Sequence, residues 1–127
     1  MRLATLALAA AASVAGLSSA HAFEASFSWK GVAACSGGSP AFTIKGAPAG
    51  TAQLRFGLKD LNAIDFPHGG STVVYAGKGT VPAGAINYRA PCPPAGEHHK
   101  YVWTIESLDA SGKVLGKTQV SGVYPPQ

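Results

Sequence analysis

The chain has 127 residues, with 10 lysines and arginines against 6 aspartates and glutamates, and a formal net charge of +4 at pH 7. Its basic residues are scattered and form no basic run or arginine-rich helix, which favours a mildly cationic surface over a nucleic-acid-binding patch. The length suits one domain with one hydrophobic core.

Residues 1–22 have the features of a secretory signal peptide. Arg2 supplies a positive charge, residues 3–17 form an apolar run, and Ala20, His21 and Ala22 fit the small-x-small rule for cleavage. The alternative is a permanent membrane anchor, but the run is shorter than the roughly 20 residues that span a bilayer. We therefore expect a single domain of residues 23–127, exported to the periplasm or the medium, with no transmembrane segment after signal removal.

The chain after residue 22 is rich in strand patterns. In residues 23–30, apolar and polar side chains alternate, which predicts a strand with one buried face. The predicted strands span residues 23–30, 41–45, 53–59, 71–76 and 100–108, followed by one or two strands within residues 113–124. Turn-forming residues occupy 46–50 and 109–112, and no window shows a helical apolar period. The pattern predicts an all-β fold, an antiparallel β-sandwich.

Two cysteines, Cys35 and Cys92, follow the predicted signal segment. An even pair in an exported chain is usually bridged, so we predict a disulfide that closes a loop of 57 residues. Two buried free thiols or a metal site are the alternatives.

Two ionisable residues lie on the buried faces of predicted strands. Asp60 continues the parity of the apolar residues in strand 53–59, and His99 continues backwards the parity of Tyr101 in strand 100–108. Buried ionisable groups are costly unless they are paired or partly wet. We therefore expect these side chains to line a pocket where the two layers open.

His68 is followed by Gly69 and Gly70, which leave its imidazole uncrowded, although a surface or capped histidine is the alternative. The stiff segment 91–96 contains Pro91 and Pro93, whose rings fix the backbone. This segment is expected to form a wall of the pocket, to cover a sheet edge, or to do both.

A block of proline, histidine and tyrosine carries the most specific motif. Its sequence, in residues 90–103, is Ala-Pro-Cys-Pro-Pro-Ala-Gly-Glu-His-His-Lys-Tyr-Val-Trp. It resembles the Gly-Pro-x-Pro-Pro-x-Gly-x-His-Arg-Tyr-x-Phe/Trp signature of the phosphatidylethanolamine-binding protein family, whose bacterial members are also called Raf-kinase-inhibitor-like proteins. Residues 39–42 and 46–51 are similar to its Ser-Pro-x-Leu and Pro-x-Gly-Thr segments, and residues 106–109 to its Ala-Leu-Asp strand end.

The resemblance implies a β-sandwich-like fold with a small pocket for anionic groups such as phosphorylethanolamine, phosphate or acetate. By matching position it implies pocket residues as follows: Asp60, His68, Pro91, Pro93, His99 and Tyr101. The sequence departs from the family in four ways. The remainder of the Asp-Pro-Asp-x-Pro motif is missing after Asp60, Gly69 replaces tryptophan after the histidine, Ala90 replaces glycine, and the C-terminal helical part of longer members is absent.

These features favour an exported, non-enzymatic binding protein with a small pocket for an anion or phospholipid headgroup, without cofactor or metal. One alternative is an inhibitor or interaction protein that presents segment 91–96 to a protease or another partner. The other is a metal-dependent hydrolase using Asp60, His68 and His99, but no serine elbow, P-loop or paired-cysteine zinc motif occurs.

Overall fold

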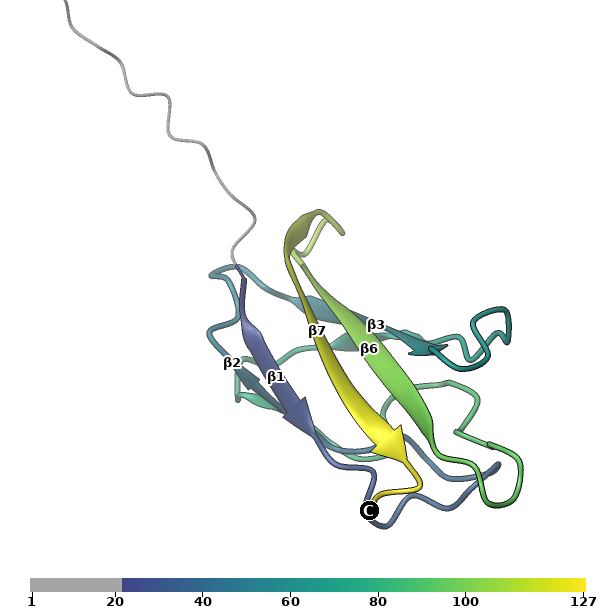
Figure 1. The fold of residues 1–127 in the computed structure, drawn as a ribbon. Coiled ribbons are helices and arrows are strands. Elements are labelled where there is room, and N and C mark those ends of the chain that lie inside the picture. Colours follow the sequence, from purple (N-terminus) through teal and green to yellow (C-terminus); the bar gives the residue numbers. More distant parts are fainter. Residues whose placement is uncertain (1–21) are drawn as a thin grey trace, which may run out of the picture.

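The computed structural model describes residues 22–127 (Figure 1). The predicted signal peptide therefore lies outside the described residues, except for Ala22. The strands, in chain order, are β1 (Glu24–Phe27), β2 (Phe42–Lys45), β3 (Gln53–Asp60), β4 (Thr72–Val74), β5 (Thr80–Val81), β6 (His99–Leu108) and β7 (Val114–Tyr124). Within the part of the chain that is described, no helix is long and apolar enough to cross a membrane.

The strands form two antiparallel sheets that face each other (Figure 1). One has the order β1-β2-β5 and the other the order β4-β3-β6-β7. The predicted all-β antiparallel sandwich is thereby confirmed. In strand β3 the alternate residues Leu54, Phe56 and Leu58 are buried, whereas Arg55 and Lys59, which point to the opposite face, are exposed.

The core between the sheets is mainly aromatic. Trp103 is fully buried, and the ring centroids of Trp29, Phe42 and Phe56 lie 6.1, 5.4 and 6.0 Å from its own. Such rings each bury a large apolar area, and their tilted and edge-on contacts add to the stabilisation. The core thus fixes the alignment of β6, on which two candidate site residues lie.

The observed strands differ from the predicted ranges at several ends, and one short strand was not predicted. Strand β1 ends at Phe27, yet Trp29 beyond it is buried and its Nε1 donates to the carbonyl of Gly122 (3.3 Å). Of the one or two strands expected within residues 113–124, the structure has one, β7, from Val114 to Tyr124, with β6 as its partner. The two-residue strand β5 was not predicted, because Gly79 before it and Pro82 after it signal a turn rather than a strand.

The predicted disulfide between Cys35 and Cys92 is present. It joins the loop after β1 to the loop before β6, and the amide of Cys35 also donates to the carbonyl of Pro91 (2.8 Å). The proline-rich segment is therefore held covalently against the sandwich.

Candidate functional site

A carboxylate–imidazole pair forms where two neighbouring strands meet at one edge. Strand β3 ends at Asp60 and β6 begins at His99, and the antiparallel register pairs Asp60 with Tyr101. The Nδ1 atom of His99 lies 2.7 Å from the Oδ2 atom of Asp60, and both residues are buried. The buried carboxylate of Asp60 is thus paired, which offsets the free-energy cost of removing its charge from water.

The surroundings of Asp60 keep it ionised. Burial alone would raise its pKa, but the hydrogen bond from His99, the amide of Asn62 and the charge of His99 lower the pKa below its ordinary value. The Asn62 amide donates to Oδ1 over 2.8 Å, so both carboxylate oxygens are occupied. Because Asp60 accepts at Nδ1 of His99, the free ring nitrogen is Nε2, which lies 3.9 Å from the exposed carboxylate of Glu97.

His68 is held by the backbone in a similar way. Its Nδ1 lies 2.7 Å from the carbonyl of Arg89, which can only accept, so Nδ1 carries the proton and Nε2 is left for another partner. The amide of Arg89 donates in return to the carbonyl of His68 (2.7 Å). The histidine is buried, and the turn after it requires glycine, because a Cβ on Gly70 would lie 1.8 Å from the carbonyl oxygen of Phe56.

Tyr101 lies near both imidazoles. Its ring centroid is 5.4 Å from that of His68 and 6.3 Å from that of His99. The phenol is fully buried and lies near the carboxylate of Asp60, but it makes no hydrogen bond of acceptable geometry to any described group. Burial, with the negative charge of Asp60, raises its pKa far above the ordinary value, so the phenol stays protonated and can donate.

The two predicted wall residues differ in their placement. Pro91 is fully buried, and the segment that leads to it runs beside His68 through the Arg89 contacts. Pro93 is half-buried, with no described hydrogen bond to the cluster. The structure therefore brings Asp60, His68, His99 and Tyr101 together, while Pro91 is buried and Pro93 half-buried in the loop that leads to β6.

Comparison with known proteins yields structural relatives only. No protein-family model matches the sequence, and no curated protein is similar to it. A Chlamydia trachomatis protein described as a homologue of phosphatidylethanolamine-binding protein superposes with a TM-score of 0.56 at 17% identity, over 85% of this chain and 94% of that one. E. coli YbcL, described as a member of the mammalian family of these proteins, superposes with a TM-score of 0.55 at 18% identity, over 84% of this chain and 100% of that one.

This chain has the phosphatidylethanolamine-binding protein fold. The resemblance inferred from residues 90–103 thus agrees with the fold. At these identities the likeness concerns the fold alone, so the chemistry of the site rests on the side chains described above.

Two contributors to the site were not predicted from the sequence. Asn62 orients Asp60 through its amide, and its side-chain oxygen accepts from the amide of Lys100 (2.8 Å). The order Asp-x-Asn is a signal for such an Asx turn. Glu97 lies two residues before His99, close enough to reach its free nitrogen, but nothing in the linear pattern singles out an exposed glutamate.

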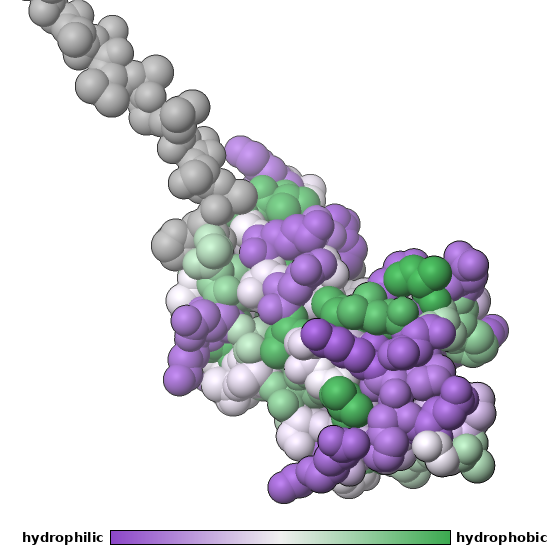
Figure 2. All heavy atoms as spheres, in the orientation of Figure 1, coloured by the Kyte–Doolittle hydropathy of each residue, from purple (hydrophilic) through white to green (hydrophobic). Residues whose placement is uncertain are grey.

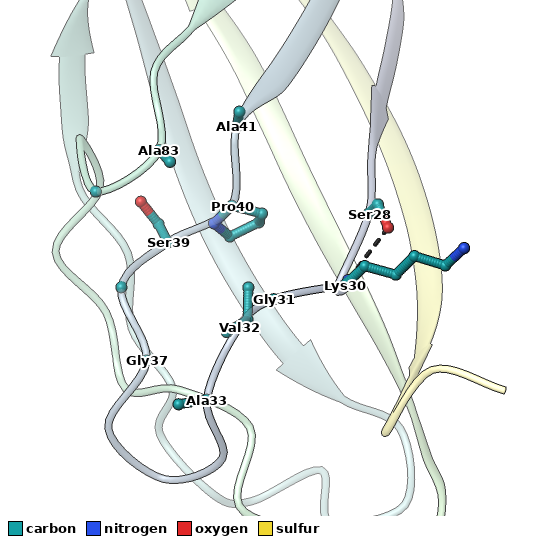
Figure 3. A pocket seen from close by; sticks show the side chains of 12 residues that line it. Ser28, Lys30, Gly31, Val32, Ala33, Gly37, Ser39, Pro40, Ala41 and Ala83 are labelled. Carbon is teal, nitrogen blue, oxygen red and sulfur yellow. Dashed lines mark hydrogen bonds between the residues drawn. The ribbon is translucent and has the colours of Figure 1, made fainter.

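Two hollows differ in their relation to the site. One of about 360 Å³ is lined by His68 with Pro67, Gly69 and residues of β3. Another, of about 700 Å³, is formed by the loop after β1 together with Ala83 and Gly84 (Figure 3). Its buried Ser39 already accepts from the amide of Ile86 (3.0 Å), so this second hollow offers few free polar groups to a ligand. Within residues 22–127, no three histidine, cysteine, aspartate or glutamate side chains gather as a metal site.

Proposed function

We propose that this chain is an exported, non-enzymatic binding protein that holds a small anionic group, such as a phosphate, a carboxylate or the phosphate of a phospholipid headgroup. The binding groups are the phenol of Tyr101 and the Nε2 atoms of His68 and His99. The observation that carries the proposal is the buried Tyr101 hydroxyl without a described hydrogen-bond partner. An unsatisfied buried donor is costly, so a ligand that accepts from this hydroxyl would gain a hydrogen bond that the free protein lacks.

The imidazoles explain how an anion would be held. Each donates or pairs through Nδ1, which leaves one nitrogen free. When protonated, that nitrogen donates to an anion in a charge-assisted hydrogen bond, which is stronger than a neutral one. Asp60 orients the His99 ring through the hydrogen bond at Nδ1, as carboxylates do for other functional histidines.

The charge balance of the site bears on the kind of ligand it would hold. The carboxylates of Asp60 and Glu97 lie beside His99 and oppose a bare anion. Glu97 would in addition favour a ligand that carries an amine next to its anionic group.

The test is titration calorimetry with inorganic phosphate and with phosphorylethanolamine. His99→Ala should weaken binding by about 1–3 kcal/mol, the cost of losing a hydrogen bond to a charged group. His98→Ala is the matched control, because His98 is exposed and its Nδ1 contacts only the carbonyl of Pro125 (3.0 Å). Equal affinity of wild type and His99→Ala, with unchanged circular dichroism, would remove His99 from the site.

Export is tested separately. N-terminal sequencing of protein recovered from the periplasm or medium should return Phe23 as the first residue. Phe23 is buried in the core, so cleavage just before it would leave the packing intact. Recovery of Met1 on exported protein would reject the signal peptide.

A second candidate is an inhibitor or interaction protein that uses segment 91–96. The segment is exposed at Pro94, Ala95 and Gly96, and the disulfide fixes its base. A preformed exposed loop loses little entropy when it binds a partner. A screen of proteases against the exported protein would test this role, and the Cys35→Ser, Cys92→Ser double variant should lose any inhibition found.

A further inference from the structure

The loop between β3 and His68 exposes three large apolar side chains. Leu61, Ile64 and Phe66 are 49%, 52% and 44% exposed, all within six residues. Val123, which is 41% exposed, belongs to the same end of the molecule: it pairs with Lys100, whose carbonyl accepts from the amide of Leu61 (2.8 Å). Figure 2 shows hydrophobic residues gathered at this end, bordered by hydrophilic ones. Single exposed apolar residues are ordinary, but a cluster of them marks an interaction surface.

The apolar side chains are held outward by an ordered loop. The side-chain oxygen of Asn62 accepts from the amide of Lys100, and its own amide donates to Asp60. Within the loop the amide of Phe66 donates to the carbonyl of Ala63 (3.0 Å). The exposed groups therefore sit on a fixed projection, which loses little entropy on binding.

The base of the loop is basic. Lys59 precedes it, and Lys100 is bonded to it through its backbone; both are exposed, and neither forms an ion pair with any described residue. The register pairs Lys59 with Val102, so Lys59 and Lys100 are diagonal neighbours on the outer face of the sheet. The loop itself carries one acidic residue, Asp65.

An apolar tip above a pair of lysines is complementary to an anionic bilayer. Apolar side chains enter the boundary between headgroups and acyl chains, while lysines contact the phosphates at the surface. The hollow beside the tip, lined in part by Leu61 and Lys100, measures only about 160 Å³, whereas the exposed apolar side chains suit a deformable lipid surface. The loop also adjoins the candidate site, because the ring centroids of Phe66 and His68 lie 4.6 Å apart. A bilayer bound by the loop would therefore lie beside the site.

We propose that residues 61–66 insert into the interface of a bilayer that contains anionic phospholipid, with Lys59 and Lys100 against its headgroups. Both ends of the loop are site residues, Asp60 and His68, so docking would hold the pocket at the level of the headgroups. The idea that docking presents a lipid headgroup to the pocket rests on the proposed function. The docking of the loop itself does not depend on the pocket.

The test is co-sedimentation of the exported protein with vesicles of phosphatidylcholine mixed equally with phosphatidylglycerol. The triple variant Leu61→Ser, Ile64→Ser, Phe66→Ser should bind at least about tenfold more weakly, because three buried apolar side chains are lost from the interface. The matched control is Val74→Ser with Val114→Ser, two exposed valines outside the loop, which should bind as the wild type does. Lys59→Gln with Lys100→Gln should lose the preference for anionic over pure phosphatidylcholine vesicles.

A second measurement does not depend on the triple variant folding. Phe66→Trp places a fluorophore on the tip, and its emission should shift to shorter wavelength when vesicles are added. Titration of the triple variant with inorganic phosphate should give the wild-type affinity, which separates failure of the docking from failure of the pocket. Wild type that leaves the vesicles unbound, or a triple variant that binds them equally, would overturn the proposal. A wild-type dimer that the triple variant converts to monomer would also overturn it, in favour of a second copy of the chain.

Discussion

Replacement of Tyr101 by phenylalanine separates a structural role of the phenol from a binding role. The change removes one hydroxyl and keeps the ring, so the ring contacts with His68 and Trp29, at 5.4 and 5.9 Å between centroids, are retained. In the free protein the hydroxyl is fully buried and unpartnered among the described residues. Leaving such a group unsatisfied costs about 1–3 kcal/mol. Tyr101→Phe should therefore leave the free energy of unfolding unchanged or raise it by up to about 2 kcal/mol.

The opposite sign is expected if the phenol donates to Asp60. A hydrogen bond to a carboxylate contributes about 1.5–3 kcal/mol, and Tyr101→Phe would then destabilise the protein by that amount. Urea unfolding followed by tryptophan fluorescence at pH 7 measures the difference, and calorimetry with phosphate measures the binding. The expected result is intact or increased stability with affinity about 10-fold lower or more, equivalent to at least 1.4 kcal/mol. A loss of stability above about 1.5 kcal/mol with unchanged affinity would refute the reasoning.

Three further predictions concern stability. Asp60→Asn should lower the free energy of unfolding at pH 7 by about 1–3 kcal/mol. The pKa of the Asp60 carboxyl is lowered from 3.8 in the folded state, so the unfolded state binds more protons as the pH falls. In urea titrations the wild type should therefore lose the stability that ionised Asp60 contributes as the pH falls below 3.8. A variant whose stability falls with pH as the wild type's does would contradict this role of Asp60. Replacing both Cys35 and Cys92 by serine should cost about 4 kcal/mol for a bridge across 57 residues, and adding reductant should destabilise the wild type but leave the variant unchanged. Gly70→Ala should destabilise by about 3 kcal/mol, since its Cβ would lie 1.8 Å from a backbone oxygen of β3 at a φ of 155°, whereas Gly57→Ala, with open space around it, should have little effect on the urea midpoint.

The alternation of side chains along the strands is enough to predict the sheets and part of the site. Because residues two apart share a face, the parity of β3 and β6 by itself assigns Asp60, His99 and Tyr101 to the buried side. The pairing of the two cysteines likewise follows from their number and the expected export. These inferences succeed because each depends on local geometry or on a count.

Other features depend on contacts between distant segments, and no local pattern encodes them. The position of His68 beside Tyr101 results from the backbone of Arg89, 21 residues away, which holds the imidazole. Whether the Tyr101 hydroxyl has a hydrogen-bond partner depends on all the residues packed around it. Strand β5 forms only because β2 provides a strand edge with which it can pair.

The sequence by itself thus determined the class of fold, the faces of its strands and the residue types of the site. Only the tertiary structure decided which of those residues touch, which nitrogen of each imidazole is left free, and that the loop of Leu61 and Phe66 projects from the sandwich. The physical reason is that strand periodicity is repeated every two residues and can be read locally. Hydrogen-bond partners and exposure depend instead on the packing of the whole chain.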